Sequence, residues 1–221
     1  MNVVIFGATG MIGQGVLLEC LDDPEIESVL AVVRRSCVKE HPKLRELLHD
    51  DFFDYSGIEK ELSGYDTCLF CLGVSSAGMN EERYSHLTFD LTVKAAEMLA
   101  GLNPEMTFCY VSGAGTDSSE SGRIMWARVK GKTENHLLQL PFKAAYMFRP
   151  GFIQPMKGIK SSTRLYRVLY TVTTPLYPLF RALVPNLFTT TEKLGLVMIS
   201  VARHGHESPI LEARDIRALA P

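Results

Sequence analysis

The first apolar segment of the chain runs directly into three glycines spaced three residues apart. Residues 3–13 read Val-Val-Ile-Phe-Gly-Ala-Thr-Gly-Met-Ile-Gly. Gly7 would allow a sharp turn, Gly10 a close approach of a pyrophosphate to the backbone, and Gly13 close packing of a helix on the strand. The helix that follows would direct its free amide hydrogens and its positive dipole end at the phosphates. Because the glycines follow four apolar residues and precede a helix, they predict a dinucleotide-binding strand–helix unit rather than a ligand-free turn.

The composition is that of one folded α/β domain. The chain has 221 residues, of which 46% are hydrophobic and 22% charged, so it can bury a large core. Its formal net charge of −2 does not favour binding to nucleic acid or to an anionic membrane surface. The longest apolar stretch, 168–184, is interrupted by Pro175, Pro178 and Arg181 and does not predict a membrane span. We expect a single domain over residues 1–221.

The start of the chain and its five cysteines bear on its compartment. Met1 leads directly into the first strand, so we expect no signal peptide or transit segment and a cytoplasmic protein with reduced thiols. Cys68 and Cys71 stand three residues apart in a buried strand, where successive side chains face opposite sides of the sheet. One face cannot present both thiols to an ion or join them, so we predict two buried apolar cysteines and no metal site.

Segments of strand and helix character alternate along the chain. We expect strands over 3–6, 29–33, 46–49, 67–72, 107–111 and 144–148, and helices over 11–21, 80–101 and 124–140. Asn80 is the expected N-cap of the second helix, because Glu81 and Glu82 follow it in the first turn. This alternation predicts a doubly wound parallel sheet with right-handed crossovers. Its ligand crevice would lie at the carboxyl ends of the strands, near the switch in strand order.

The segment 155–188 departs from the alternation. It is rich in Leu, Tyr, Thr and Pro, and we expect a small helical cap over the crevice rather than a separate domain. A hydrophobic surface helix that forms a dimer is the alternative. Thr189-Thr-Thr-Glu192 then predicts a capping box for a helix that runs to about Arg203, with Gly205 beyond its end. Residues 209–212 could form a last short strand.

Arg34 and Arg35 follow the second expected strand, at the position that distinguishes the two nicotinamide cofactors. In dinucleotide-binding folds an acidic residue here bonds the ribose 2′-hydroxyl, whereas an arginine accommodates a 2′-phosphate. No Asp or Glu stands at this strand end, and a guanidinium suits a phosphate by its charge and its fork of donors. The sequence therefore favours NADP(H) over NAD(H), the alternative being a solvated charge pair.

Five segments together resemble a known family: 7–13, Phe70-Cys-Leu-Gly73, Val111-Ser112, Val129-Lys130-Gly131 and Phe148-Arg-Pro-Gly151. In order and spacing they are similar to the atypical short-chain dehydrogenase/reductases, over nearly the whole chain. The resemblance implies an epimerase-like Rossmann fold that binds NADPH. It implies cofactor contacts from the glycine loop, from Asp51 and Phe52 beside the adenine, and from Leu72 and Gly73 beside the ribose. The loop residues are Gly7, Thr9, Gly10, Met11, Ile12 and Gly13.

The family's catalytic signature is Tyr-x-x-x-Lys with a serine at the end of the fifth strand. A lysine one helical turn from the tyrosine lowers the pKa of the phenol and bonds the nicotinamide ribose, and the phenol exchanges a proton with the substrate oxygen. Ser112 matches the serine and Lys130 the lysine, but Trp126 stands where the tyrosine is expected. An indole N–H only donates and does not titrate usefully, so the departure puts reductase or epimerase chemistry in doubt while cofactor binding stands.

Other residues offer weaker candidates for a proton donor. Tyr84 and His86 begin the helix after the fourth strand, but the spacing of Tyr84 favours core packing and His86 favours a solvated residue. His204 and His206 lie in a distant turn. We therefore predict an NADP(H)-binding oxidoreductase-like protein, with an unidentified small, fairly apolar carbonyl or alcohol as substrate. The alternative is a non-catalytic, NADPH-dependent sensor or partner-binding module.

Overall fold

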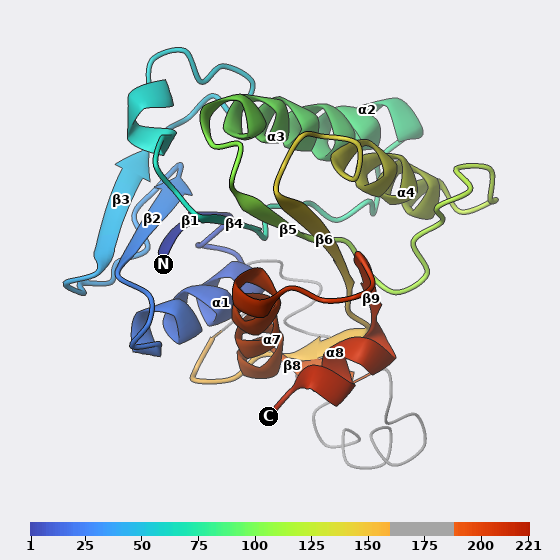
Figure 1. The fold of residues 1–221 in the computed structure, drawn as a ribbon. Coiled ribbons are helices and arrows are strands. Elements are labelled where there is room, and N and C mark those ends of the chain that lie inside the picture. The colour runs from blue at the N-terminus through green and yellow to red at the C-terminus, as the bar shows by residue number, and fades with distance from the viewer. Residues whose placement is uncertain (160–187) are drawn as a thin grey trace.

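The computed structural model describes residues 1–159 and 188–221 and contains a seven-stranded parallel sheet (Figure 1). The order of the strands is β3-β2-β1-β4-β5-β6-β9. Their bounds are β1 Asn2–Phe6, β2 Ser28–Val33, β3 Leu44–Leu48, β4 Thr67–Phe70, β5 Thr107–Val111, β6 Ala144–Arg149 and β9 Ile210–Glu212. After a polar first residue the central strands are apolar and buried, as expected for parallel strands covered on both faces. The predicted α/β doubly wound fold is confirmed.

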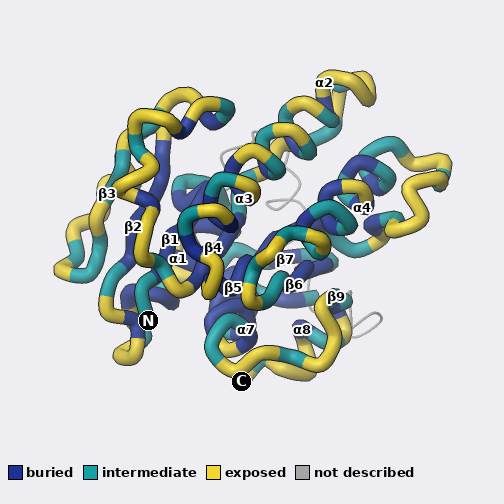
Figure 2. Tube along the Cα trace, turned by 45° about the horizontal axis from the view of Figure 1, so that its top comes forward, coloured by how far each residue is buried: buried dark blue, intermediate teal, exposed yellow. Residues whose placement is uncertain are grey.

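Helices cover both faces of the sheet (Figure 1). One face carries α1 (Met11–Asp22), α7 (Thr191–His204) and α8 (Ala213–Leu219), which pack on a core that includes Val3, Ile5 and Phe148. The other carries α2 (Glu81–Ser85), α3 (Leu91–Leu102) and α4 (Met125–Leu137), over a core that includes Val4 and Phe6. Figure 2 shows the buried strands between exposed loops.

The strand order reverses direction between β1 and β4. The chain steps from β1 outward through β2 to β3, and then crosses back to β4 on the other side of β1. At the carboxyl end of this pair Phe6 is aligned with Phe70, so the loops that follow the two strands leave the sheet side by side. Such a switch point is where open α/β sheets bind ligands.

Cys68 and Cys71 face opposite layers, as the strand periodicity predicts, but β4 ends at Phe70, and Cys71 just beyond it is partly rather than fully buried. Cys68 lies in the core under α3, whereas Cys71 packs against the core under α1. Burial raises the pKa of the Cys71 thiol to about 12 and that of Cys68 well above its usual value, so both behave as apolar side chains.

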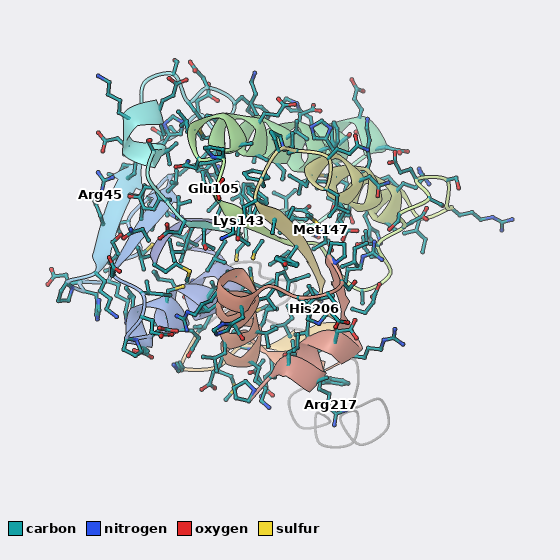
Figure 3. The ribbon with its side chains drawn as sticks, viewed as in Figure 1. Arg45, Glu105, Lys143, Met147, His206 and Arg217 are labelled. Carbon is teal, nitrogen blue, oxygen red and sulfur yellow. The ribbon has the colours of Figure 1, made fainter. Side chains whose placement is uncertain are left out.

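At the edge of the sheet, Arg45 of β3 forms an exposed ion pair with Glu61, with 2.6 Å between Nη1 and Oε2 (Figure 3).

The expected helix over 80–101 is continuous in space but not regular. Asn80 does cap α2, because its side-chain oxygen accepts the N–H of Arg83 at 3.0 Å. A π-helical turn, His86–Asp90, then separates α2 from α3. The apolar residues of this segment keep a helical spacing of three or four across the π-turn, so the sequence pattern does not reveal it.

The expected capping box at Thr189–Glu192 lies one residue out of register. The N-cap of α7 is Thr190, whose hydroxyl accepts the N–H of Lys193 at 3.1 Å. Thr189 belongs instead to β8 (Phe188–Thr190), which pairs with β7 (Phe152–Gln154) in a small second sheet. Gly205 ends α7 with a φ of +74°, and the expected last strand forms as β9.

The expected cap, 155–188, lies largely in residues 160–187, outside the described part of the chain. It remains a prediction, as does its alternative as a dimer-forming helix.

Candidate functional site

The glycine loop connects β1 to α1 with contacts that leave no room for side chains. Gly7 has a φ of +82°, and a Cβ there would lie 2.6 Å from the backbone nitrogen of Leu72. A Cβ on Gly13 would lie 2.1 Å from the carbonyl oxygen of Gly7. A Cβ on Gly10 would meet only that same oxygen, at 3.3 Å, so its absence leaves space above the loop. The loop has the close turn and close helix packing that the sequence predicts for Gly7 and Gly13.

The N-terminus of α1 has no capping side chain or acidic residue that would compete with a bound anion. Gly10 is its N-cap, no side chain caps it, and its first turn contains no acidic residue. The amide hydrogens of that turn, around Met11 and Ile12, therefore have no side-chain acceptor from a cap. Together with the helix dipole this is a favourable environment for a phosphate.

A pocket lies beside this loop at the switch point. We call it the switch-point pocket; Arg34, Asp51, Phe52, Leu72 and Gly73, all singled out from the sequence, line it. They come from three loops, after β2, β3 and β4. Arg35 is exposed and is not among the lining residues. The structure thus brings Arg34 to the pocket and separates it from its neighbour in sequence.

Five further lining residues were not predicted: Asp50, Phe53, Val74, Leu87 and Leu91. Leu87 belongs to the π-helical turn and Leu91 to the start of α3. Phe53 donates its N–H to Asp51 Oδ1 at 2.9 Å, and its ring stacks on His86 with centroids 4.4 Å apart and planes at 4°. An Asp two residues before an aromatic signals such a turn in sequence, whereas the stack depends on the irregular helix.

Lys130 and Ser112 meet at the carboxyl end of β5. Lys130 Nζ donates to the carbonyl oxygen of Ser112 at 2.5 Å and lies 6.0 Å from the centre of the Tyr110 ring. Loss of hydration lowers the pKa of Lys130 to about 8, against an opposing effect of Glu134 one helical turn further on. The two residues predicted to act together are thus in direct contact, through the serine's backbone.

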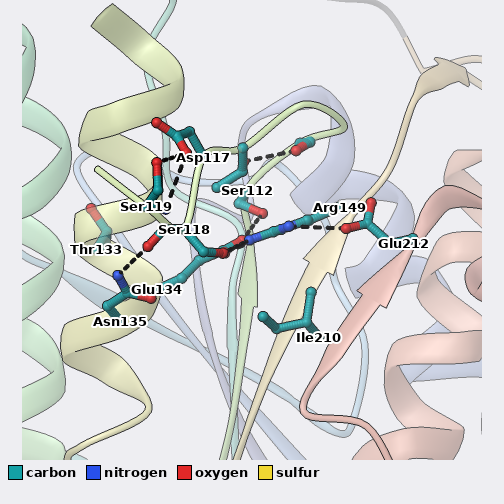
Figure 4. Close-up of polar contacts among 12 residues, drawn as sticks. Ser112, Asp117, Ser118, Ser119, Thr133, Glu134, Asn135, Arg149, Ile210 and Glu212 are labelled. Atoms are coloured by element: carbon teal, nitrogen blue, oxygen red, sulfur yellow. Dashed lines mark hydrogen bonds and ion pairs between the residues drawn. The ribbon is translucent and has the colours of Figure 1, made fainter. Parts of the chain in front are cut away.

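The Ser112 side chain belongs to a cluster of charges that the sequence did not predict (Figure 4). Its hydroxyl lies 2.5 Å from Glu134 Oε1 and 3.1 Å from the Phe148 carbonyl oxygen. Glu134 is fully buried and accepts hydrogen bonds from Arg149 Nε, 3.1 Å from each carboxylate oxygen, and from Arg149 Nη2.

Arg149 extends this cluster to the sheet edge. Its Nη1 donates to Glu212 Oε1 at 2.9 Å and its Nη2 to Ser118 Oγ at 2.5 Å. Figure 4 shows the guanidinium between the two glutamates. We call Ser112, Ser118, Glu134, Arg149 and Glu212 the charged cluster. It joins α4 to the ends of three strands, β5, β6 and β9. The only sequence signals were the Arg-Pro-Gly segment and the Lys-x-x-x-Glu spacing on α4.

Trp126 occupies the first turn of α4, one turn before Lys130. Its side chain is partly exposed and borders Gly115. Tyr84 is only 2% exposed, in line with core packing. Burial also raises the pKa of Tyr110 far above its usual value. Neither tyrosine is thus an exposed phenol at the crevice.

The histidines have local roles. His86 is exposed, as expected, and its Nδ1 lies 3.0 Å from Asp90 Oδ2. His206 lies in the connection between α7 and β9 (Figure 3), where its backbone N–H donates to Tyr146 Oη at 3.0 Å. His204 ends α7. Neither of the last two contributes to the switch-point pocket.

Comparisons with known proteins give distant relatives. No protein-family model matches the chain. It is 26% identical over 73% of its length to Leucinostatins biosynthesis cluster protein T of Purpureocillium lilacinum, covering 61% of that protein. It is 28% identical over 69% of its length to Protein fmp52-2, mitochondrial, of Aspergillus oryzae, covering 67% of that protein. It is also 27% identical over 69% of its length to Protein HTATIP2 of Rattus norvegicus, covering 62% of that protein.

The relatives agree with the resemblance drawn from the motifs, which extends to the Tat-interacting oxidoreductase-like protein. The chain spans about three fifths to two thirds of the length of these curated relatives. None of the described helices is long and apolar enough to cross a membrane. The name of the Aspergillus oryzae relative places that protein in mitochondria, so a cytoplasmic location for this chain stays a prediction.

Solved structures share the fold over nearly the whole chain. A thiolation-reductase di-domain from an archaeal non-ribosomal peptide synthetase superposes with a TM-score of 0.71 at 12% identity, covering 96% of this chain and 70% of that one. The enzyme WbmF of Bordetella bronchiseptica, in complex with NAD+, superposes with a TM-score of 0.67 at 15% identity, covering 98% and 76%. The chain has the Rossmann-type fold found in NAD(P)-binding, epimerase-like proteins of the short-chain dehydrogenase/reductase type.

Proposed function

We propose that this distant relative of HTATIP2 and the FMP52 proteins is an NADP(H)-binding, atypical short-chain dehydrogenase/reductase-like protein. One observation carries the proposal: Arg34, Asp51 with Phe52, and Leu72 with Gly73 come from three separate loops and line one pocket at the switch point. The glycine loop beside it has the cradle that a dinucleotide needs, since a Cβ at Gly7 or Gly13 would collide with backbone. The solved neighbour in complex with NAD+ supports a nicotinamide dinucleotide as the ligand class.

Each part of the site has a distinct role in holding the cofactor. The free amides at the start of α1 and Gly10 would bind the pyrophosphate, with Thr9, Met11 and Ile12 beside it. Asp51 and Phe52 would border the adenine, and Leu72 and Gly73 the ribose. Two positively charged side chains would make the remaining contacts with the cofactor. Arg34 would bind the 2′-phosphate, which favours NADPH over NADH, and Lys130 would bond the nicotinamide ribose.

The chain's own residues determine which chemistry can follow. NADPH, when bound, supplies a hydride equivalent. Ser112 and Lys130 would hold the substrate oxygen and the ribose, for a small, fairly apolar carbonyl or alcohol. Trp126 offers no titratable proton, so we expect turnover to be slow compared with that of an enzyme with the usual tyrosine.

A second candidate function is a non-catalytic, NADPH-dependent sensor or partner-binding module. The orientation of Ser112 favours it, because the hydroxyl that would hold a substrate lies 2.5 Å from the buried Glu134. In this case cofactor occupancy would order the predicted cap, 155–188, and present a surface to a protein partner.

The experiment that tests cofactor binding is calorimetric titration of the wild-type protein with NADPH and with NADH. We expect both to bind, with NADPH the tighter. Equal affinities would contradict the NADP(H) preference but leave dinucleotide binding intact. Absence of any heat, checked by equilibrium dialysis, would reject the proposed function as a whole.

A further inference from the structure

A reductive site needs a proton donor, and the usual one is missing here. Trp126 stands at the tyrosine position, and Tyr84 and Tyr110 are 2% and 1% exposed. Ser112 is 8% exposed, and its hydroxyl faces Glu134 and a backbone carbonyl. If hydride transfer occurs, the substrate oxygen must take its proton from another group, or from water.

Lys130 is the candidate donor that lies at the ligand-binding end of the sheet. It projects from the second turn of α4 to the carboxyl end of β5, the edge of the sheet at which ligands bind in this fold. An ammonium has three hydrogens, and the bond to the Ser112 carbonyl oxygen uses one of them. The contact holds Nζ in place and leaves hydrogens for a substrate.

Ser112 links Lys130 to the charged cluster through its backbone carbonyl and its side-chain hydroxyl. The serine carbonyl accepts from Lys130 Nζ, and its hydroxyl faces Glu134, one turn further along the same helix. Glu134 in turn is fixed by Arg149. A shift of α4 along the sheet would therefore break both contacts, so the cluster fixes the height of α4 from which Lys130 reaches the end of β5.

We propose that Lys130 is itself the proton donor for carbonyl reduction in this protein, in place of the tyrosine absent from α4. This inference rests on the proposed function. In the step, the carbonyl carbon gains a hydride from bound NADPH, which becomes NADP+. One N–H bond of Lys130 breaks as an O–H bond forms on the substrate oxygen, and the neutral amine regains a proton from water. Aldehydes and ketones are the substrate class.

The charge environment of Lys130 suits this role. Its pKa of about 8 lies close enough to neutral pH for the group to be protonated and still able to release a proton. Loss of hydration lowers the pKa, and the carboxylate of Glu134 on α4 raises it again. Tyr110, on β5, keeps its proton over this range because burial raises its pKa, and Arg149 keeps its charge.

The test compares Lys130→Arg with Lys132→Arg, a control two residues further along α4 whose ammonium lies 4.3 Å from the centre of the Phe89 ring. Arginine keeps the charge but cannot release a proton near neutral pH. With NADPH and a panel of aldehydes and ketones, we expect Lys130→Arg to lose at least about 100-fold in kcat while it still binds NADPH. Lys132→Arg should match the wild type. The wild-type kcat should fall as the pH rises through about 8, because the donor must be protonated.

A second measurement does not depend on turnover. Lysine side-chain NMR of the cofactor-free protein, with Lys130→Met used to assign the signal, should show Lys130 titrating well below the usual range of a lysine side chain. A normal lysine titration, a Lys130→Arg rate within threefold of wild type, or NADPH binding without measurable reduction would each overturn the proposal. The last result would leave cofactor binding intact, whereas failure to bind NADPH would overturn the proposed function and this inference with it.

Discussion

The switch-point pocket and the charged cluster lie at the same edge of one sheet but are built in opposite ways. The pocket lies beside a loop that depends on backbone packing, with glycines that turn or pack closely, and its own polar side chains, such as Arg34 and Asp51, remain exposed. The charged cluster is made of side chains that contact one another, and its central Glu134 is fully buried. The first region leaves polar side chains exposed to a ligand, whereas the paired charges of the cluster are buried against one another.

The difference has a consequence for stability. Removing one partner of a buried ion pair leaves an uncompensated charge in a low-dielectric environment, whereas removing an exposed charge from a pocket wall costs the fold little. The cluster should therefore respond to substitution through stability, and the pocket through binding.

Loss of Glu134 should have the largest effect. Glu134→Ala leaves Arg149 buried and without its main partner, and we expect a loss of about 3–5 kcal/mol in the free energy of unfolding. The matched control is Glu61→Ala at the exposed pair with Arg45, where the expected loss is about 0–1 kcal/mol. Urea denaturation of the two variants measures the contrast, and equal losses would contradict it.

A side chain in the glycine loop should also destabilise, because there the backbone itself is tightly packed. Gly13→Ala places a Cβ 2.1 Å from the Gly7 carbonyl oxygen, and we expect a loss of about 3 kcal/mol. Gly101→Ala in α3, where nothing lies within 4 Å, should instead gain about 0.4–1 kcal/mol. Thermal unfolding distinguishes the lower stability expected for Gly13→Ala from the higher stability expected for Gly101→Ala. A Gly13→Ala protein as stable as wild type would show that the loop can shift.

A phenol at the tyrosine position should add the family's usual acid to the one proposed for Lys130. Trp126→Tyr puts a titratable hydroxyl one turn before Lys130, and we expect kcat for carbonyl reduction to rise, by less than the about 100-fold or more that a first acid contributes. Trp126→Phe is the control, since it makes the same reduction in size without a hydroxyl. The rate of NADPH oxidation reports both variants. An unchanged rate for Trp126→Tyr, in a variant that still binds NADPH, would mean that α4 does not present this position to the substrate.

The smallest of these effects should appear in the pocket, as selectivity rather than stability. Arg34→Ala removes a charged contact with the 2′-phosphate, and we expect NADPH affinity to fall by on the order of 2 kcal/mol while NADH affinity is retained. Arg35→Ala is the control, because Arg35 does not line the pocket. Calorimetry with both cofactors decides, and an equal loss in the two variants would favour the alternative of a solvated charge pair.

The amino-acid sequence by itself determined the fold and the pocket side of the site. The alternation of strand and helix predicted the sheet, and the glycine spacing predicted the turn at Gly7 and the close packing at Gly13. Arg34 could be chosen because it directly follows the second strand, whereas Asp51 and Gly73 were implied by the family resemblance; all three lie in loops that follow a strand. Parallel strands end at one edge of the sheet, so their following residues come together without any knowledge of side-chain packing.

Tertiary structure alone decided which side chains are already engaged. The sequence assigned Ser112 to a substrate, yet its hydroxyl meets Glu134, which is 22 residues away in sequence. The pairing of Arg149 with Glu134 and Glu212 spans 15 and 63 residues. The π-helical turn that brings Leu87 to the pocket left no mark in the apolar period. Backbone geometry follows from local sequence, but charge pairing and burial depend on which distant segments pack together, and only the folded chain fixes those neighbours.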